Sequence, residues 1–275
     1  MAPLFPRATI VAFGLALLWA MPGSAALSPS DESMAALSAL DVLVSPNQDA
    51  AIQVRLKKTA QRKLPVAGQS LELVQGDKVI GETVTDEGGR ALFHYVPKVK
   101  GTVTLTVRGK PPSPSIAPTG VRVSVWERRT PLLAVEFGAL ELEPGSRKPI
   151  ADAADELTKL SLFYYNILYV VSEVAGQDDA FAASADVRRW LADNRFPPGH
   201  ILVLAGGVPS FGATLDELRA AGWATLKIGV GRSRGFAEAF LQRRLEAVMV
   251  PEPAKGEVPR KAKIAKEWKE VRKQL

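Results

Sequence analysis

The apolar stretch Leu132-Leu133-Ala134-Val135 separates two regions of different sequence pattern. A run without polar residues is typical of a strand that is buried on both faces, as strands of parallel sheets are. Beyond it, apolar strand-like runs alternate with helical segments, at 152–162, 167–171, 180–194, 201–204, 215–221, 224–230, 236–245 and 247–250. This alternation predicts a C-terminal α/β domain over residues 131–251, doubly wound around a mainly parallel sheet.

The region before this stretch has a period of two. Ile52-Gln53-Val54-Arg55-Leu56 alternates apolar and polar residues, and residues 86–89, with the sequence DEGG, form one of several turn signals between such runs. Short strands at this spacing predict an N-terminal all-β sandwich over residues 41–126.

One hairpin of the predicted sandwich has a specific pattern. Residues 85–93 read TDEGGRALF, and Tyr95, Pro97 and Gly101-Thr102 follow. Phe93 and Tyr95 share one face of the strand after the turn. The pattern resembles bacterial immunoglobulin-like and carboxypeptidase-regulatory-like modules. That resemblance implies an immunoglobulin-like sandwich and says little about function.

The first 26 residues have the features of a secretory signal peptide. Arg7 precedes an apolar run over residues 8–21, and small residues at 23–26 offer a cleavage site. An uncleaved membrane anchor is the alternative, although the run is short for a bilayer span of about 20 residues. We therefore expect an exported bacterial protein, periplasmic or secreted, with a linker over residues 27–40.

Composition excludes several kinds of chemistry. The 275 residues include no cysteine, which excludes disulfides and thiolate zinc sites, and only two histidines, His94 and His200, which disfavours a multi-histidine metal site. Most of the net charge of +6 falls within residues 252–275. Since a nucleic-acid-binding protein needs a basic face on its folded domain, we expect no nucleic-acid partner.

Polar residues follow several of the predicted strands. Glu136 ends the first, Ser172 follows the second, and Lys227 stands close to the glycine-rich end of the fourth. In this order they resemble the haloacid dehalogenase-like (HAD-like) phosphatases over residues 132–251, especially the lipin and phosphatidate-phosphatase branch. The resemblance implies a phosphoryl site in which one aspartate attacks phosphorus, a second is the acid/base, and late acids hold Mg²⁺.

The sequence departs from that family at the decisive positions. Glu136 stands at the nucleophile position, Gly138 at the acid/base position, and Arg232 and Phe236 where the family has polar or acidic residues. A glutamate misplaces an in-line attack and a glycine cannot donate a proton. We therefore expect a catalytically inactive pseudoenzyme without metal or cofactor. The alternative is a divergent phosphatase acting on phosphoesters, with Glu136 as its catalytic residue and Mg²⁺ as its cofactor.

An anion site is the sharper hypothesis for the same region. Backbone amides at the start of the 236–245 helix and nearby cations favour phosphate or carboxylate. The predicted anion-binding residues are Ser172, Lys227, Gly231, Arg232, Ser233 and Arg234. Three alternatives stay open: Glu136 pairs with one of the two arginines, Ser172 caps a turn or helix, or the glycines at 229, 231 and 235 form an atypical dinucleotide loop.

The basic tail over residues 252–275 predicts an amphipathic helix. Ile264, Trp268, Val271 and Leu275 recur every three or four residues, with lysines around them. Either the helix docks on its own domain through Trp268, or the segment from Arg260 to Leu275 makes a peripheral contact with an anionic membrane.

Together these patterns predict an exported, two-domain envelope protein. Its phosphatase-like domain would be a binding or interaction module for an unidentified protein partner or an anionic ligand. A divergent phosphatase and a purely structural spacer are the alternatives.

Overall fold

The computed structural model describes residues 35–275, apart from 59–63, 113–115, 173–176, 206 and 255. The predicted signal peptide and most of the predicted linker lie outside the described residues. All described residues belong to one compact unit, Ser33–Leu275. Among them, no helix is both long enough and apolar enough to cross a bilayer.

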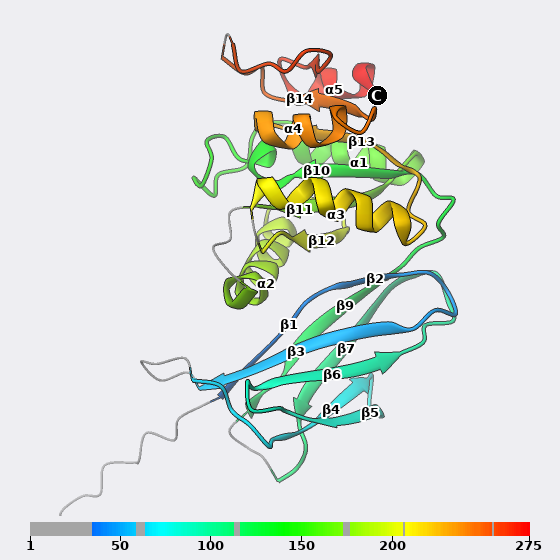
Figure 1. Ribbon diagram of the computed structural model, residues 1–275, viewed down its shortest axis with the longest axis vertical. Coiled ribbons are helices and arrows are strands. Elements are labelled where there is room, and N and C mark those ends of the chain that lie inside the picture. Colours follow the sequence, from blue (N-terminus) through cyan, green and yellow to red (C-terminus); the bar gives the residue numbers. More distant parts are fainter. Residues whose placement is uncertain (1–34, 59–63, 113–115, 173–176, 206, 255) are drawn as a thin grey trace, which may run out of the picture. The chain divides into compact units, whose positions relative to one another are not determined.

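Two sheets form a β-sandwich at the N-terminal side (Figure 1). The first has the strand order β6-β3-β1-β8 and consists of β1 (Ala35–Ala39), β3 (Ala50–Lys58), β6 (Arg90–Tyr95) and β8 (Ile116–Ala117). The second has the order β2-β9-β7-β4-β5 and consists of β2 (Val42–Val44), β4 (Ser70–Gln75), β5 (Lys78–Val84), β7 (Gly101–Gly109) and β9 (Thr119–Val125). Alternate residues of β3, among them Ile52 and Leu56, point into a core shared with Leu73 and Leu105 of the second sheet. The period of two in the sequence therefore corresponds to burial on one face of each strand.

A third sheet has six parallel strands in the order β12-β11-β10-β13-β14-β15. Its strands are β10 (Leu132–Glu136), β11 (Asn166–Val171), β12 (His200–Val203), β13 (Leu226–Gly231), β14 (Glu246–Met249) and β15 (Lys263–Ile264). A short 3₁₀-helix, η1 (Phe137–Leu140), follows β10. All five residues of β10 are buried, which explains why this strand is continuously apolar up to Glu136.

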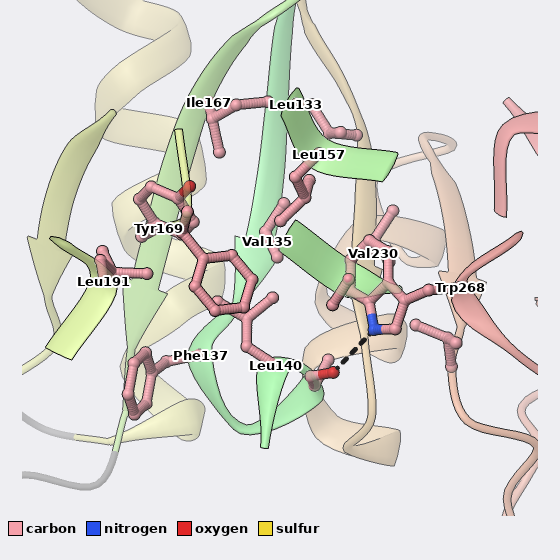
Figure 2. Packing of buried hydrophobic residues seen from close by; sticks show 14 of the residues in the cluster. Leu133, Val135, Phe137, Leu140, Leu157, Ile167, Tyr169, Leu191, Val230 and Trp268 are labelled. Atoms are coloured by element: carbon pink, nitrogen blue, oxygen red, sulfur yellow. Dashed lines mark hydrogen bonds between the residues drawn. The ribbon is translucent and has the colours of Figure 1, made fainter. Parts of the chain in front are cut away.

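Helices cover both faces of the third sheet. Leu133 and Val135 of β10 share one core with α1 (Ala153–Phe163), α2 (Gln177–Asp193) and α5 (Trp268–Gln274). Leu132 and Ala134 share another core with α3 (Val208–Ala220) and α4 (Arg234–Leu241). Figure 2 shows the first of these cores, where Leu133, Val135, Leu157 and Trp268 converge.

The predicted fold class, an immunoglobulin-like sandwich followed by a HAD-like doubly wound domain, is wrong. The described residues combine antiparallel and parallel sheets, with parallel pairs β1–β8 and β2–β9 inside the sandwich, and they contain fifteen strands but only five α-helices. Among these described residues there is no clear doubly wound HAD-like domain. The strand–helix alternation stops after α4, because no helix lies between β14 and β15 among the described residues.

The basic tail packs on the third sheet. Trp268 is fully buried, and its indole Nε1 donates to the Ala139 carbonyl at 3.0 Å (Figure 2). Val271 is also fully buried, while Lys269 forms an ion pair with Asp152 at 3.1 Å. The helix is shorter than predicted, because Lys263–Ile264 forms β15 and α5 begins only at Trp268. Of the two interpretations of the tail, the structure shows this helix docked through Trp268, so its two buried apolar side chains already pack inside the molecule.

Candidate functional site

The carboxyl ends of β10 and β13 meet around Glu136, which is only 4% exposed. Its Oε2 accepts hydrogen bonds from the backbone N–H groups of Arg232 at 2.6 Å and Ser233 at 2.7 Å. The Ser233 hydroxyl donates to Oε1 and accepts from the Phe236 N–H at 3.2 Å, as the N-cap of α4. Glu136 thus occupies the helix N-terminus at which the sequence predicts an external anion, and the carboxylate complements the helix dipole.

Two glycines of β13 make this arrangement possible. A Cβ on Gly231 would lie 2.3 Å from Phe236 Cδ1 and 2.8 Å from Glu136 Oε2. A Cβ on Gly229 would lie 2.4 Å from Phe240 Cε2. The glycines therefore let the two phenylalanines of α4 pack against the strand, which accounts for the pattern that resembled a dinucleotide loop.

The two predicted anion-binding arginines contact the protein itself. Arg232 donates through Nη2 to the carbonyls of Glu141 at 2.7 Å and Leu142 at 3.2 Å. Burial lowers the pKa of Arg232, and the neighbouring Glu136 acts in the opposite direction. Arg234 donates to Glu238 at 2.7 Å, one turn further along α4. Both guanidinium groups thus help to hold α4 and the loop after η1.

The other two predicted residues lie elsewhere. Ser172 follows β11 at the same edge of the sheet as Glu136, where it lines a cavity of only about 60 Å³ beside Phe137 and Arg147. Lys227 is the second residue of β13 and its neighbour Leu226 pairs with Leu132, so it lies at the opposite, amino-terminal edge. Because strands of a parallel sheet begin at one edge and end at the other, Lys227 does not join Glu136 in one site.

The strand ends are therefore closed by the protein's own groups. Within the described part of the chain, no group of three or more His, Cys, Asp or Glu side chains is placed to hold a metal ion. His200, at the start of β12, is buried, and burial lowers its pKa to about 3. This keeps the imidazole neutral at physiological pH, packed edge-on to Trp126.

A larger hollow, of about 610 Å³, lies between the sandwich sheet β6-β3-β1-β8 and the elements α2 and β12. We call it the arginine groove. Its charged residues are Arg55 of β3, Asp86 of the turn between β5 and β6, and Arg90 of β6. Its apolar residues include Leu92, Phe181 and Val203.

Arg55 and Arg90 are directly opposite each other in the antiparallel pair β3–β6. Like charges at such positions repel and destabilise a sheet. Burial, and then the charge of Arg90, lower the pKa of Arg55, whereas Asp86 raises it. Asp86 Oδ1 also accepts a hydrogen bond from the Arg90 backbone N–H at 2.8 Å. Two arginines and one aspartate are therefore the charged side chains that the described residues place at the groove.

A buried ion pair links the sandwich to the α2 side of the groove. Asp41, between β1 and β2, binds Arg188 of α2 and accepts from the Arg122 N–H at 3.1 Å. Burial raises the pKa of Asp41, while the charge of Arg188 opposes that shift. Arg188 also donates to the Gly120 carbonyl at 3.4 Å. These contacts hold the two sides of the groove together.

The sequence does not predict the arginine groove, because Arg55 and Arg90 lie in different strands and only the register of β3 and β6 brings them together. One signal was present. Both residues fall on the outward-facing positions of strands with a period of two, next to a turn that the sequence identifies at residues 86–89.

No family model matches the chain, and no curated protein matches it. Among solved structures, the CARDB domain of the PF1109 protein from Pyrococcus furiosus is 13% identical over 34% of this chain and 94% of that chain, with a TM-score of 0.25. The chitinase ChiW from Paenibacillus sp. str. FPU-7 is 11% identical over 85% of this chain and 22% of that chain, with a TM-score of 0.24. At such identities and TM-scores, these similarities assign neither a fold family nor an activity.

Proposed function

We propose that this protein is a non-enzymatic binding protein that holds an anionic ligand in the arginine groove. The observation that carries the proposal is the opposed pair Arg55 and Arg90 at the largest hollow described above. A carboxylate or phosphate between two guanidinium groups relieves their repulsion and accepts charge-assisted hydrogen bonds from both. Export to the bacterial envelope belongs to the same proposal and rests on the sequence of residues 1–26 alone.

The lining of the groove favours a ligand with an apolar portion. Leu92 is 45% exposed, and Phe181 and Val203 line the hollow from the other side. Binding sites of this kind combine a mostly apolar lining with a few polar groups that fix orientation. We therefore favour an organic anion, with the charged end at the arginines and the apolar end between Leu92 and Phe181.

The closed strand ends support binding over catalysis. Glu136, the one candidate nucleophile, is buried and accepts three hydrogen bonds from Arg232 and Ser233. A carboxylate that accepts these hydrogen bonds is held in place and is not free to attack a substrate. Phosphoester hydrolysis would require these contacts to break.

Calorimetric titration of the purified protein with octanoate and with inorganic phosphate tests the proposal. We expect Arg55→Gln and Arg90→Gln each to weaken binding about tenfold or more, since a hydrogen bond to a charged group contributes about 1.5–3 kcal/mol. Lys98→Gln, which removes an exposed cation outside the groove, is the matched control and should change nothing. Absence of binding to the unaltered protein, or equal binding by all three variants, would refute the proposal.

A further inference from the structure

The amino-terminal edge of the parallel sheet carries a set of cations that the proposed function does not use. Every strand of this sheet begins at that edge, because all neighbouring pairs are parallel. The turns and first residues that lead into the strands place exposed cations there, and we call this set the cationic edge: Arg128, Arg129, Arg195, Lys227, Arg244 and Lys261.

Acidic residues near this edge offset only part of its charge. Glu127 forms ion pairs with Lys100 at 3.0 Å and with Arg129 at 3.0 Å. Glu246 pairs with Lys263 at 2.6 Å, a cation outside the set defined above. Asp193, at the end of α2, is another acidic residue in these segments. The balance is clearly positive over several separate turns.

Three of these cations have a left-handed backbone conformation. Arg195, Arg244 and Lys261 have φ values of 60°, 57° and 76°. This left-handed region favours glycine or asparagine in a tight turn. A long cationic side chain therefore stands at positions where the turn alone would favour a different residue.

Three consecutive large apolar residues reach the same edge. α1 ends at Phe163, and two residues separate it from β11, which begins at Asn166. Leu162, Phe163 and Tyr164 are 70%, 72% and 59% exposed. We call these three residues the apolar tip. The rings of Phe163 and Tyr164 lie 6.2 Å apart in a tilted arrangement. Contiguous exposed apolar side chains of this size mark a surface that meets another apolar phase or partner.

We infer that the apolar tip and the cationic edge together dock the protein on an anionic lipid surface. Cations in separate turns complement a broad layer of negative headgroups, and aromatic side chains favour the membrane–water interface. A nucleic acid would instead favour cations along a groove that follows its backbone. The docked α5 cannot supply the apolar contact, because Trp268 and Val271 are fully buried.

This surface is separate from the arginine groove. None of the residues that line the groove belongs to the apolar tip or the cationic edge. Membrane docking and ligand binding can therefore fail independently, and each has its own variants.

Co-sedimentation of the full chain with vesicles tests the inference. One vesicle type contains phosphatidylcholine with about one third phosphatidylserine, and the other contains phosphatidylcholine alone. We expect binding to the anionic vesicles only, weakened by added salt because exposed charges are screened. The triple variant Arg195→Gln, Arg244→Gln, Lys261→Gln should bind about tenfold to a hundredfold more weakly.

A control triple removes the same charge from other surfaces: Lys78→Gln, Lys148→Gln, Arg189→Gln, all at exposed positions. It should bind within about twofold of the unaltered protein. Leu162→Ser with Phe163→Ser should lose vesicle binding without lowering the melting temperature, since both side chains are exposed.

Several results would overturn the inference. They are equal binding to both vesicle types, equal losses in the two triple variants, and tighter binding to a DNA duplex than to the anionic vesicles. A self-association that the Leu162→Ser, Phe163→Ser variant abolishes, without any vesicle binding, would show instead that the apolar tip meets a second copy of the chain.

Discussion

The charged side chains at the end of β10 and in the arginine groove have opposite surroundings. At the end of β10, the buried carboxylate of Glu136 accepts hydrogen bonds from two backbone amides and one hydroxyl of the same chain. In the groove, Arg55 and Arg90 face each other across a strand pair, where the charge of Arg90 lowers the pKa of Arg55 and Asp86 raises it. The first arrangement stabilises the fold and leaves little for a ligand to do. We expect the second arrangement to gain stability when an anion binds, as the proposed function requires.

Glu136→Ala gives the largest expected effect. It removes the acceptor of three hydrogen bonds at a site that is 4% exposed. Buried donors left without partners cost about 1–3 kcal/mol each, partly relieved by water, so we expect a loss of about 2–4 kcal/mol. That corresponds to a fall in melting temperature of about 5–15 °C. Thermal unfolding of Glu136→Ala beside the exposed control Glu143→Ala measures this fall. Equal melting temperatures of the two variants would show that the hydrogen bonds to Glu136 do not stabilise the fold.

Gly231→Ala tests the same region through packing. The added Cβ would lie 2.3 Å from Phe236 and 2.8 Å from the Glu136 carboxylate, so α4 must shift. Overpacking of this kind costs about 1–3 kcal/mol. Gly138→Ala is the matched control, since nothing lies within 4 Å of its Cβ position. Chemical denaturation of both variants should show a loss for Gly231→Ala alone, and a loss of the same size in both would contradict the role given to Gly231.

Arg90→Gln should have a smaller effect of the opposite sign. Without ligand, it removes the repulsion with Arg55 and should raise the free energy of unfolding by up to about 1 kcal/mol. The same variant should lose affinity for anions. Denaturation at low ionic strength, with Lys98→Gln as the control, measures the change in stability. A destabilised Arg90→Gln would mean that the arginine pair serves the fold, as Glu136 does.

We expect no phosphatase activity, and therefore no effect of a Glu136 substitution on it. We expect no Mg²⁺-dependent turnover of p-nitrophenyl phosphate above the buffer rate, and no difference between the unaltered protein and Glu136→Gln. Metal-dependent turnover that disappears in Glu136→Gln while the protein remains folded would contradict the structural role given to Glu136 and would show a catalytic one.

Much of the local structure could be predicted from the sequence, but little of the candidate functional site could. The apolar run at residues 132–135 identified the central strand, since burial on both faces leaves no room for polar residues. The fold class expected from the resemblance to HAD-like phosphatases was wrong, and that resemblance rested on the order of Glu136, Ser172 and Lys227 along the chain. Order does not say at which edge of a sheet a residue lies. Lys227 lies near the start of β13, whereas Glu136 lies at the end of β10, so the two residues are at opposite edges.

Contacts between residues far apart in the sequence were harder to predict. Pairing of Glu136 with an arginine was one alternative, yet its observed acceptor contacts are to the backbone amides of Arg232 and Ser233, which the sequence cannot assign. Docking of the tail through Trp268 was predicted as an alternative, because an apolar stripe on a helix has to be covered by something. The groove was missed, since it depends on the register of two strands separated by more than thirty residues.

The central claim, that an anion binds at the arginine groove and not at the start of α4, is tested most directly by NMR. Octanoate is titrated into isotope-labelled protein, and the backbone amide shifts are followed residue by residue. We expect saturable shifts at Arg55, Arg90 and Leu92, and unchanged amide shifts at Arg232 and Ser233, whose N–H groups already donate to Glu136. Shifts confined to residues 231–236, with Arg55 and Arg90 unaffected, would contradict it.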